Sequence, residues 1–141
     1  MILNISYTNK KNSDTIDRIL GKSFGFMRRL KMGGIGSPRL NLTDADEEVS
    51  KLMNRDNNRN VCNIELRPKG IIVGFRSRLD PYVLLMPYET LLITRLNLDQ
   101  YRLESEKYFI VFHVRKNEIS THNFIHKLVD AQRMALHRGE A

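Results

Sequence analysis

The chain has 141 residues, and its 23 basic and 16 acidic side chains leave a formal net charge of +7. A compact chain of this length buries roughly two thirds of its unfolded surface and holds one core without metal or disulfide staples. Its one cysteine, Cys62, cannot form an internal disulfide, and no apolar run approaches the roughly 20 residues of a membrane span. These features exclude a disulfide-stapled secreted mini-protein and a transmembrane helix, and they predict one basic cytoplasmic domain over residues 1–141.

The N-terminal part, residues 1–60, combines a short strand pattern at 2–7 with a basic segment. The 26 positions between Asp17 and Asp44 contain no acidic residue and six cations, namely Arg18, Lys22, Arg28, Arg29, Lys31 and Arg39. Apolar residues recur there at steps that favour a helix over 14–31. Gly21 and Gly25 oppose it, because each glycine costs a helix about 1 kcal/mol relative to alanine.

Two interpretations of this basic segment stay open. Its six cations form an anion-binding surface for a membrane or a nucleic acid, or they are simply solvated while the apolar side covers the core. The glycine-rich stretch 33–38 that follows is predicted to be a flexible linker. It lacks the Gly-Lys-Ser/Thr of a phosphate-binding loop and follows no predicted strand.

A second helix is predicted over 43–54. Thr43 and Asp46 resemble a capping box, acidic residues fill the first turn, and Lys51 and Arg55 lie near the end. The polar residues 55–60 then predict a turn.

From residue 61 the apolar period changes to two, which is typical of strands. Six strands are predicted, at 61–67, 71–76, 82–86, 89–96, 101–104 and 107–114. Helical spacing from Thr121 to His137 then predicts an amphipathic C-terminal helix within 119–138. These patterns predict one core, made of Leu66, Ile71, Val73, Phe75, Leu84, Met86, Leu91, Ile93, Phe112, Phe124 and Leu128. Antiparallel hairpins (61–118) followed by one helix indicate an α+β fold.

Two stretches of this strand region, Asn63 to Val73 and Val83 to Leu91, place an apolar strand, a turn glycine, a second strand and an apolar-Pro-Tyr segment in succession. They resemble the bacterial pleckstrin-homology-like (PH-like) and GRAM-like domains over about residues 61–138. The resemblance implies two nearly orthogonal antiparallel sheets of about seven strands, closed at one end by the C-terminal helix. The basic, partly helical N-terminal part is an insertion relative to that pattern.

Some members of that superfamily bind inositol phosphates through spaced cations, and Lys69, Arg76 and Arg78 match the pattern. The resemblance makes these three residues lipid-headgroup candidates. However, Lys69 falls in a predicted hairpin turn, so the strand that follows separates it from Arg76 by about 23 Å at roughly 3.3 Å per residue.

The remaining candidates for chemistry have structural interpretations. His122 and His126 share one helix face at the spacing of zinc ligands, but no further ligand pair is near in the sequence, so a solvated face is expected and no metal site is predicted. His113 is expected to be a hydrogen-bonded core or edge residue. Cys62 is in register with Ile64 and is expected to be a small buried apolar residue.

These observations predict a non-enzymatic binding or assembly module that needs no cofactor. Its expected partner is another protein or a second copy of the chain, because strands 82–86 and 108–114 are apolar on both faces and one helix covers too little of them. A twofold homodimer is therefore expected. The alternative is a module that binds an anionic lipid surface or a nucleic acid through residues 18–39.

Overall fold

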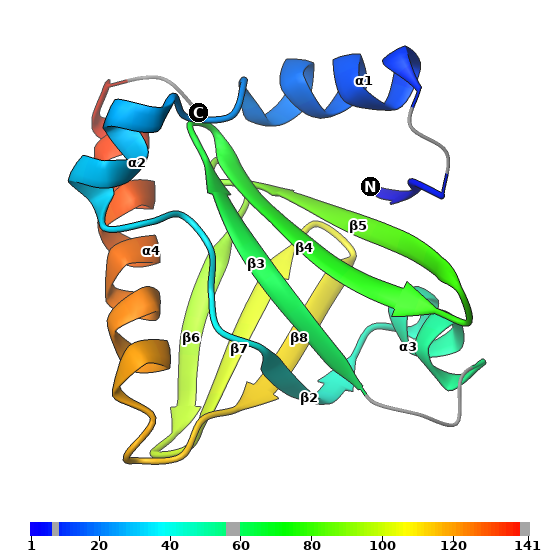
Figure 1. The fold of residues 1–141 in the computed structure, drawn as a ribbon. Coiled ribbons are helices and arrows are strands. Elements are labelled where there is room, and N and C mark those ends of the chain that lie inside the picture. Colours follow the sequence, from blue (N-terminus) through cyan, green and yellow to red (C-terminus); the bar gives the residue numbers. More distant parts are fainter. Residues whose placement is uncertain (7–8, 56–59, 139–141) are drawn as a thin grey trace.

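The computed structural model describes residues 1–6, 9–55 and 60–138, and Figure 1 shows its fold. In chain order the elements are β1 (Ile2–Asn4), α1 (Lys10–Leu20), α2 (Phe26–Met32), β2 (Leu40–Ala45), α3 (Glu47–Asn54), β3 (Val61–Arg67), β4 (Gly70–Ser77), β5 (Asp80–Pro87), β6 (Leu92–Asn97), β7 (Gln100–Ser105), β8 (Tyr108–His113) and α4 (Ile119–Arg138).

The strands form one antiparallel sheet of eight strands in the order β1-β5-β4-β3-β2-β8-β7-β6. In Figure 1, β3, β4 and β5 cross in front of β6, β7 and β8, so the sheet bends back over itself around β2. The bend coincides with a register shift between Leu42 and Asp44, where β2 pairs with β8. An extra residue in one strand increases local twist and bending.

The predicted α+β class with a C-terminal helix is confirmed, but the expected division into two sheets is not seen. Instead, β2 pairs with β3 on one side and with β8 on the other, so hydrogen bonding continues from one half to the other. This connecting strand is not among those predicted from the sequence. The sheet is not closed, because β1 and β6 are its two edges.

One large buried cluster fills the space between the two halves of the sheet. It contains every predicted core residue except Ile93, which packs against it half-buried. Helix α4 closes this core with Phe124, Ile125 and Leu128, all of them buried. The side chain of Gln132 on the same helix donates to the carbonyls of Tyr88 and Leu91, which fixes α4 against the β5–β6 connection.

Helix α1 covers the outer face of β5. Its Leu20 is fully buried and forms a second, smaller cluster with Val83 and Leu85, the residues of β5 that face away from the main core. Strand 82–86, which is apolar on both faces, is therefore covered by α1 of the same chain. It does not need a second copy of the chain to cover it, so this strand no longer supports the expected dimer.

The single helix expected over 14–31 is instead two helices, because both glycines interrupt it. Gly21 ends α1 at a positive φ of 80°, and Gly25 is the N-cap of α2. A Cβ at Gly21 would also lie 3.2 Å from the Pro68 side chain, so a glycine fits this contact. The region is helical, but the helices point in different directions (Figure 1).

The helix predicted over 43–54 begins later, at Glu47. Asp46, not Thr43, is its N-cap, and its carboxylate accepts hydrogen bonds from the backbone N–H groups of Glu48 and Val49. Thr43 lies inside β2 instead. Pairing of residues 40–45 with β3 and β8 overrides their local helix-start signal.

The stretch 33–38 is not the flexible linker that was expected. Ile35 is buried, and its carbonyl accepts from the N–H of Leu66, while Ser37 exchanges hydrogen bonds with Ile64. The segment thus runs along β3. Smaller differences concern strand ends: residues 89–91 precede β6, and β1 ends at Asn4. Parts of the strand predicted to Tyr7 and of the turn at 55–60 lie outside the described residues.

Candidate binding surfaces

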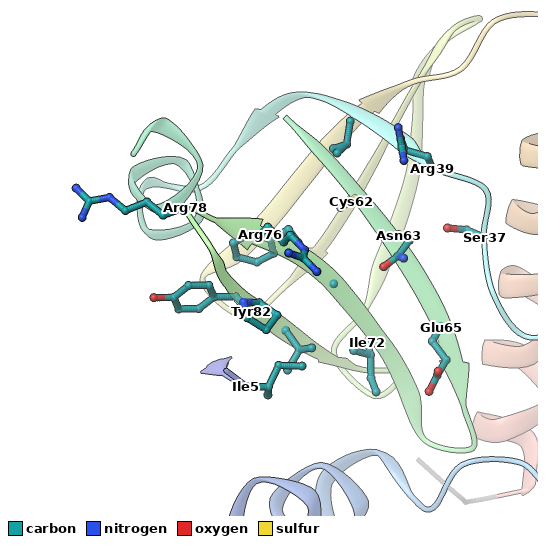
Figure 2. Close-up of a pocket in the computed structure, with 15 residues that line it drawn as sticks. Ile5, Ser37, Arg39, Cys62, Asn63, Glu65, Ile72, Arg76, Arg78 and Tyr82 are labelled. Carbon is teal, nitrogen blue, oxygen red and sulfur yellow. The ribbon is translucent and has the colours of Figure 1, made fainter. Parts of the chain in front are cut away.

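A hollow with a volume of about 950 Å³ lies on the outer face of β3, β4 and β5. Figure 2 shows its lining. Arg76 of β4 lies near its middle, Arg39 lies beyond β3, and Arg78 points outward from the β4–β5 turn. We call this hollow, with Arg39, Arg76 and Arg78 around it, the arginine groove. The amide of Asn63 lies between Arg39 and Arg76 (Figure 2).

Arg76 and Arg78 come from the end of β4 and the turn after it, Arg39 comes from the segment before β2, and none of the three contacts a carboxylate within the described residues. Glu65 is the acidic residue among those that line the groove, and its carboxylate accepts from Arg67 at 2.8 Å. Arg67 in turn also contacts Asp17. Arg67 is therefore neutralised by Glu65 and Asp17, whereas Arg39, Arg76 and Arg78 leave the groove with an excess of positive charge.

The floor of the groove depends on Gly74. It pairs with Asn63 in the β3–β4 ladder, and a Cβ at this position would lie 2.8 Å from the Asn63 Oδ1. The missing side chain lets the Asn63 amide lie across β4. Apolar residues, among them Ile72 and Val83, line the groove beside these polar groups. Planar guanidinium groups next to an amide suit phosphate or carboxylate oxygens, which they bind in a bidentate manner.

The lipid-headgroup candidates are not brought together. Arg76 and Arg78 lie at the groove, but Lys69 lies in the β3–β4 turn, at the opposite end of β4. There its backbone N–H donates to the carbonyl of Leu20, so this end of the strand is covered by α1. The separation of Lys69 from Arg76 that strand geometry predicts is confirmed. Arg39, which is not part of the sequence pattern, lines the groove together with Arg76 and Arg78.

The six cations of residues 18–39 are all exposed, but they do not form one surface. Arg39 belongs to the arginine groove and Arg18 to α1. Arg28 and Lys31 border a cavity between α2 and α4, whereas Arg29 donates to the carbonyl of Phe24 and the hydroxyl of Ser23. The structure thus divides the predicted anion-binding set among several places.

The cavity between α2 and α4 has a volume of about 630 Å³ and a largely apolar lining that includes Met27, Met32 and Met134. Tyr88 also lines it. The Tyr88 hydroxyl is buried and has no hydrogen-bond partner among the described residues, and burial raises its pKa. Such an orphaned group destabilises a fold by about 1–3 kcal/mol.

The histidine and cysteine candidates have structural roles. The His122 ring lies 2.9 Å from the Tyr101 hydroxyl and 3.0 Å from the Arg115 carbonyl, so both of its nitrogens are engaged, while His126 is exposed. His113 contacts Asp99. Cys62 is buried, and burial raises the pKa of its thiol to about 12. Within the described residues no three His, Cys, Asp or Glu side chains gather in an arrangement that would hold a metal ion.

Comparison with known proteins gives no assignment, since no family model and no curated protein matches the chain. Among the described helices, none is long and apolar enough to cross a membrane.

Proposed function

We propose that the protein is a non-enzymatic binding module of PH-like fold that recognises an anionic group in the arginine groove. The observation that carries the proposal is that Arg39, from the segment before β2, and Arg76, from β4, line one hollow with Arg78 at its rim, and that none of the three contacts a carboxylate among the described residues. Arginines that only solubilise a surface have no need to come together from distant parts of the chain. The cytoplasm, where phosphorylated ligands are abundant, is the proposed location.

The PH-like part of the proposal is supported by the strand count and by the position of the last helix. Apart from the short β1, seven antiparallel strands precede α4, and the two halves of the sheet share one core that α4 covers. Helix α3, between β2 and β3, and the N-terminal helices are additions to this arrangement.

The non-enzymatic part rests on the roles of the titratable groups. His122 and His113 are engaged in structural contacts, Asp46 caps α3, and the Cys62 thiol stays protonated because of its burial. Of these groups Cys62 lines the arginine groove, and the carboxylate that lines it, Glu65, is engaged by Arg67.

Titration calorimetry with inorganic tripolyphosphate tests the proposal. The wild type is expected to bind, and the double variant Arg39→Glu/Arg76→Glu to lose at least a hundredfold in affinity. The control Arg115→Glu/Lys116→Glu carries the same change in net charge on the exposed β8–α4 connection and is expected to bind within about threefold of the wild type. Equal losses in the two variants would show that net charge alone attracts the anion, and the groove would then have no specific role.

Self-association is a second candidate function, favoured by the edge strand β6. This strand pairs with β7 alone, and its Leu92 and Leu96 are 58% and 48% exposed. An unpaired edge with exposed leucines is suited to pairing with a second copy across a twofold axis. Light scattering at tens of micromolar is expected to give the mass of a dimer for the wild type and of a monomer for Leu92→Lys/Leu96→Lys. A monomeric wild type would refute this candidate.

A further inference from the structure

Helix α2 exposes its apolar side chains instead of burying them. Phe26, Met27 and Leu30 are 73%, 66% and 61% exposed, and no residue of the helix is buried. At about 100° per residue these three side chains share an arc of about 100°. Met32, which is half-buried against the core, falls on the opposite side of the helix. Phe26 and Leu30 therefore point away from the protein, and Met27 lies at the edge of the cavity between α2 and α4.

This orientation is held in place at both ends of the helix. At the start, the Arg29 side chain donates to the Phe24 carbonyl at 2.9 Å. At the end, Gly33 adopts the left-handed conformation of a C-cap, and Lys127 of α4 donates to the carbonyls of Gly33 and Gly34, each at 3.2 Å. These contacts hold α2 in the orientation that exposes the arc.

Cations surround the apolar arc. At about 100° per residue Arg29 and Lys31 border it on its two sides and Arg28 lies further round the helix, beyond Lys31. All three are exposed, and Lys22 precedes the helix in the connecting segment. No acidic residue occurs between Asp17 and Asp44. Met134 of α4, 47% exposed, lines the same cavity as Met27, so apolar surface continues from α2 onto α4.

We infer that α2 docks the protein onto an anionic lipid bilayer, with Phe26, Met27 and Leu30 entering the headgroup–acyl boundary and Arg28 and Lys31 contacting lipid phosphates. An apolar arc flanked by cations is the combination that interfacial helices use. A nucleic acid would engage the cations but leave aliphatic Met27 and Leu30 in water. None of the residues that line the arginine groove belongs to α2, so this inference is independent of the proposed ligand.

Sedimentation with vesicles tests the inference. The wild type is expected to bind phosphatidylcholine vesicles that contain about 30% phosphatidylglycerol and to bind pure phosphatidylcholine weakly. Phe26→Gln/Leu30→Gln, which retains good helix formers, is expected to weaken binding about a hundredfold because two apolar side chains no longer enter the bilayer. Arg28→Gln/Lys31→Gln is expected to weaken it about 30-fold.

Two matched controls separate docking from general surface effects. Leu79 and Leu98 are 88% and 83% exposed in hairpin turns, so Leu79→Gln/Leu98→Gln removes similar apolar surface elsewhere and is expected to bind like the wild type. Arg115→Gln/Lys116→Gln controls for the charge. The inference is overturned if the α2 and control variants lose vesicle binding equally, or if anionic vesicles do not retain the wild type. It is also overturned if the wild type binds duplex RNA more tightly than the anionic vesicles and Phe26→Gln/Leu30→Gln binds that RNA unchanged.

Discussion

Replacing Asp46 with alanine removes the side chain that joins α3 to the sheet. One carboxylate oxygen accepts from the N–H groups of Glu48 and Val49, both at 3.1 Å, and the other accepts from the N–H of Phe109 at 3.0 Å. Asp46 itself is only 7% exposed. Alanine therefore leaves the start of α3 uncapped and a backbone N–H of the β7–β8 region without its partner.

The expected loss follows from these contacts. An N-cap replacement costs about 0.5–2 kcal/mol, and an unsatisfied buried N–H costs about 1–3 kcal/mol. Together they predict a decrease of about 1.5–5 kcal/mol in the free energy of unfolding, measured by urea denaturation followed by circular dichroism. The control is Asp44→Ala, since exposed Asp44 accepts only from the adjacent Ala45 N–H. A loss below about 0.5 kcal/mol in Asp46→Ala, or equal losses in both variants, would refute this role of Asp46.

Three further variants test separate parts of the structure. Tyr88→Phe removes the hydroxyl that lacks a partner among the described residues, so the melting temperature is expected to rise or stay unchanged. A decrease above about 1 kcal/mol in the free energy of unfolding would show that the hydroxyl does make a stabilising hydrogen bond. The pKa of Cys62 is raised from 9.0 to about 12, so the stability it contributes is complete below pH 9 and declines by about 1.4 kcal/mol per pH unit above it. Urea denaturation between pH 8 and 10.5 is expected to show a steeper decline in the wild type than in Cys62→Ala, and parallel curves would contradict this. Gly74→Ala displaces the Asn63 amide into the groove, so tripolyphosphate affinity is expected to fall while the melting temperature changes little; unchanged affinity would argue against a role for Asn63.

The hairpins of residues 61–113 were predictable because their signals are local. Alternation of Ile64 and Leu66 with polar residues indicates which face of the strand is buried. The turn at 68–69 sets the register in which β4 pairs with β3. The core residues followed from the same periodicity. Strand β2 was not predictable in this way, since its partners are β3 and β8, and its Thr43 carries a helix-start signal that distant pairing overrides.

The arginine groove depends on contacts between distant parts of the chain. Arg39 and Arg76 are unrelated in the sequence, and they meet because the segment before β2 runs along β3, next to β4. The charge of the segment 18–39 does not say which of its cations share a surface. Likewise, the apolar spacing of Met27 and Leu30 predicted a helix correctly but suggested burial, because periodicity alone does not say which way a face points.

Backbone amide shifts of ¹⁵N-labelled protein titrated with tripolyphosphate locate the bound anion. The largest shifts are expected at Arg39, Asn63, Gly74 and Arg76, with α2 and α4 little affected at about 150 mM salt. The same set is expected to lose its shifts in Arg39→Glu/Arg76→Glu. Shifts confined to α1 and α2, or small shifts spread evenly over all basic residues, would contradict recognition in the arginine groove.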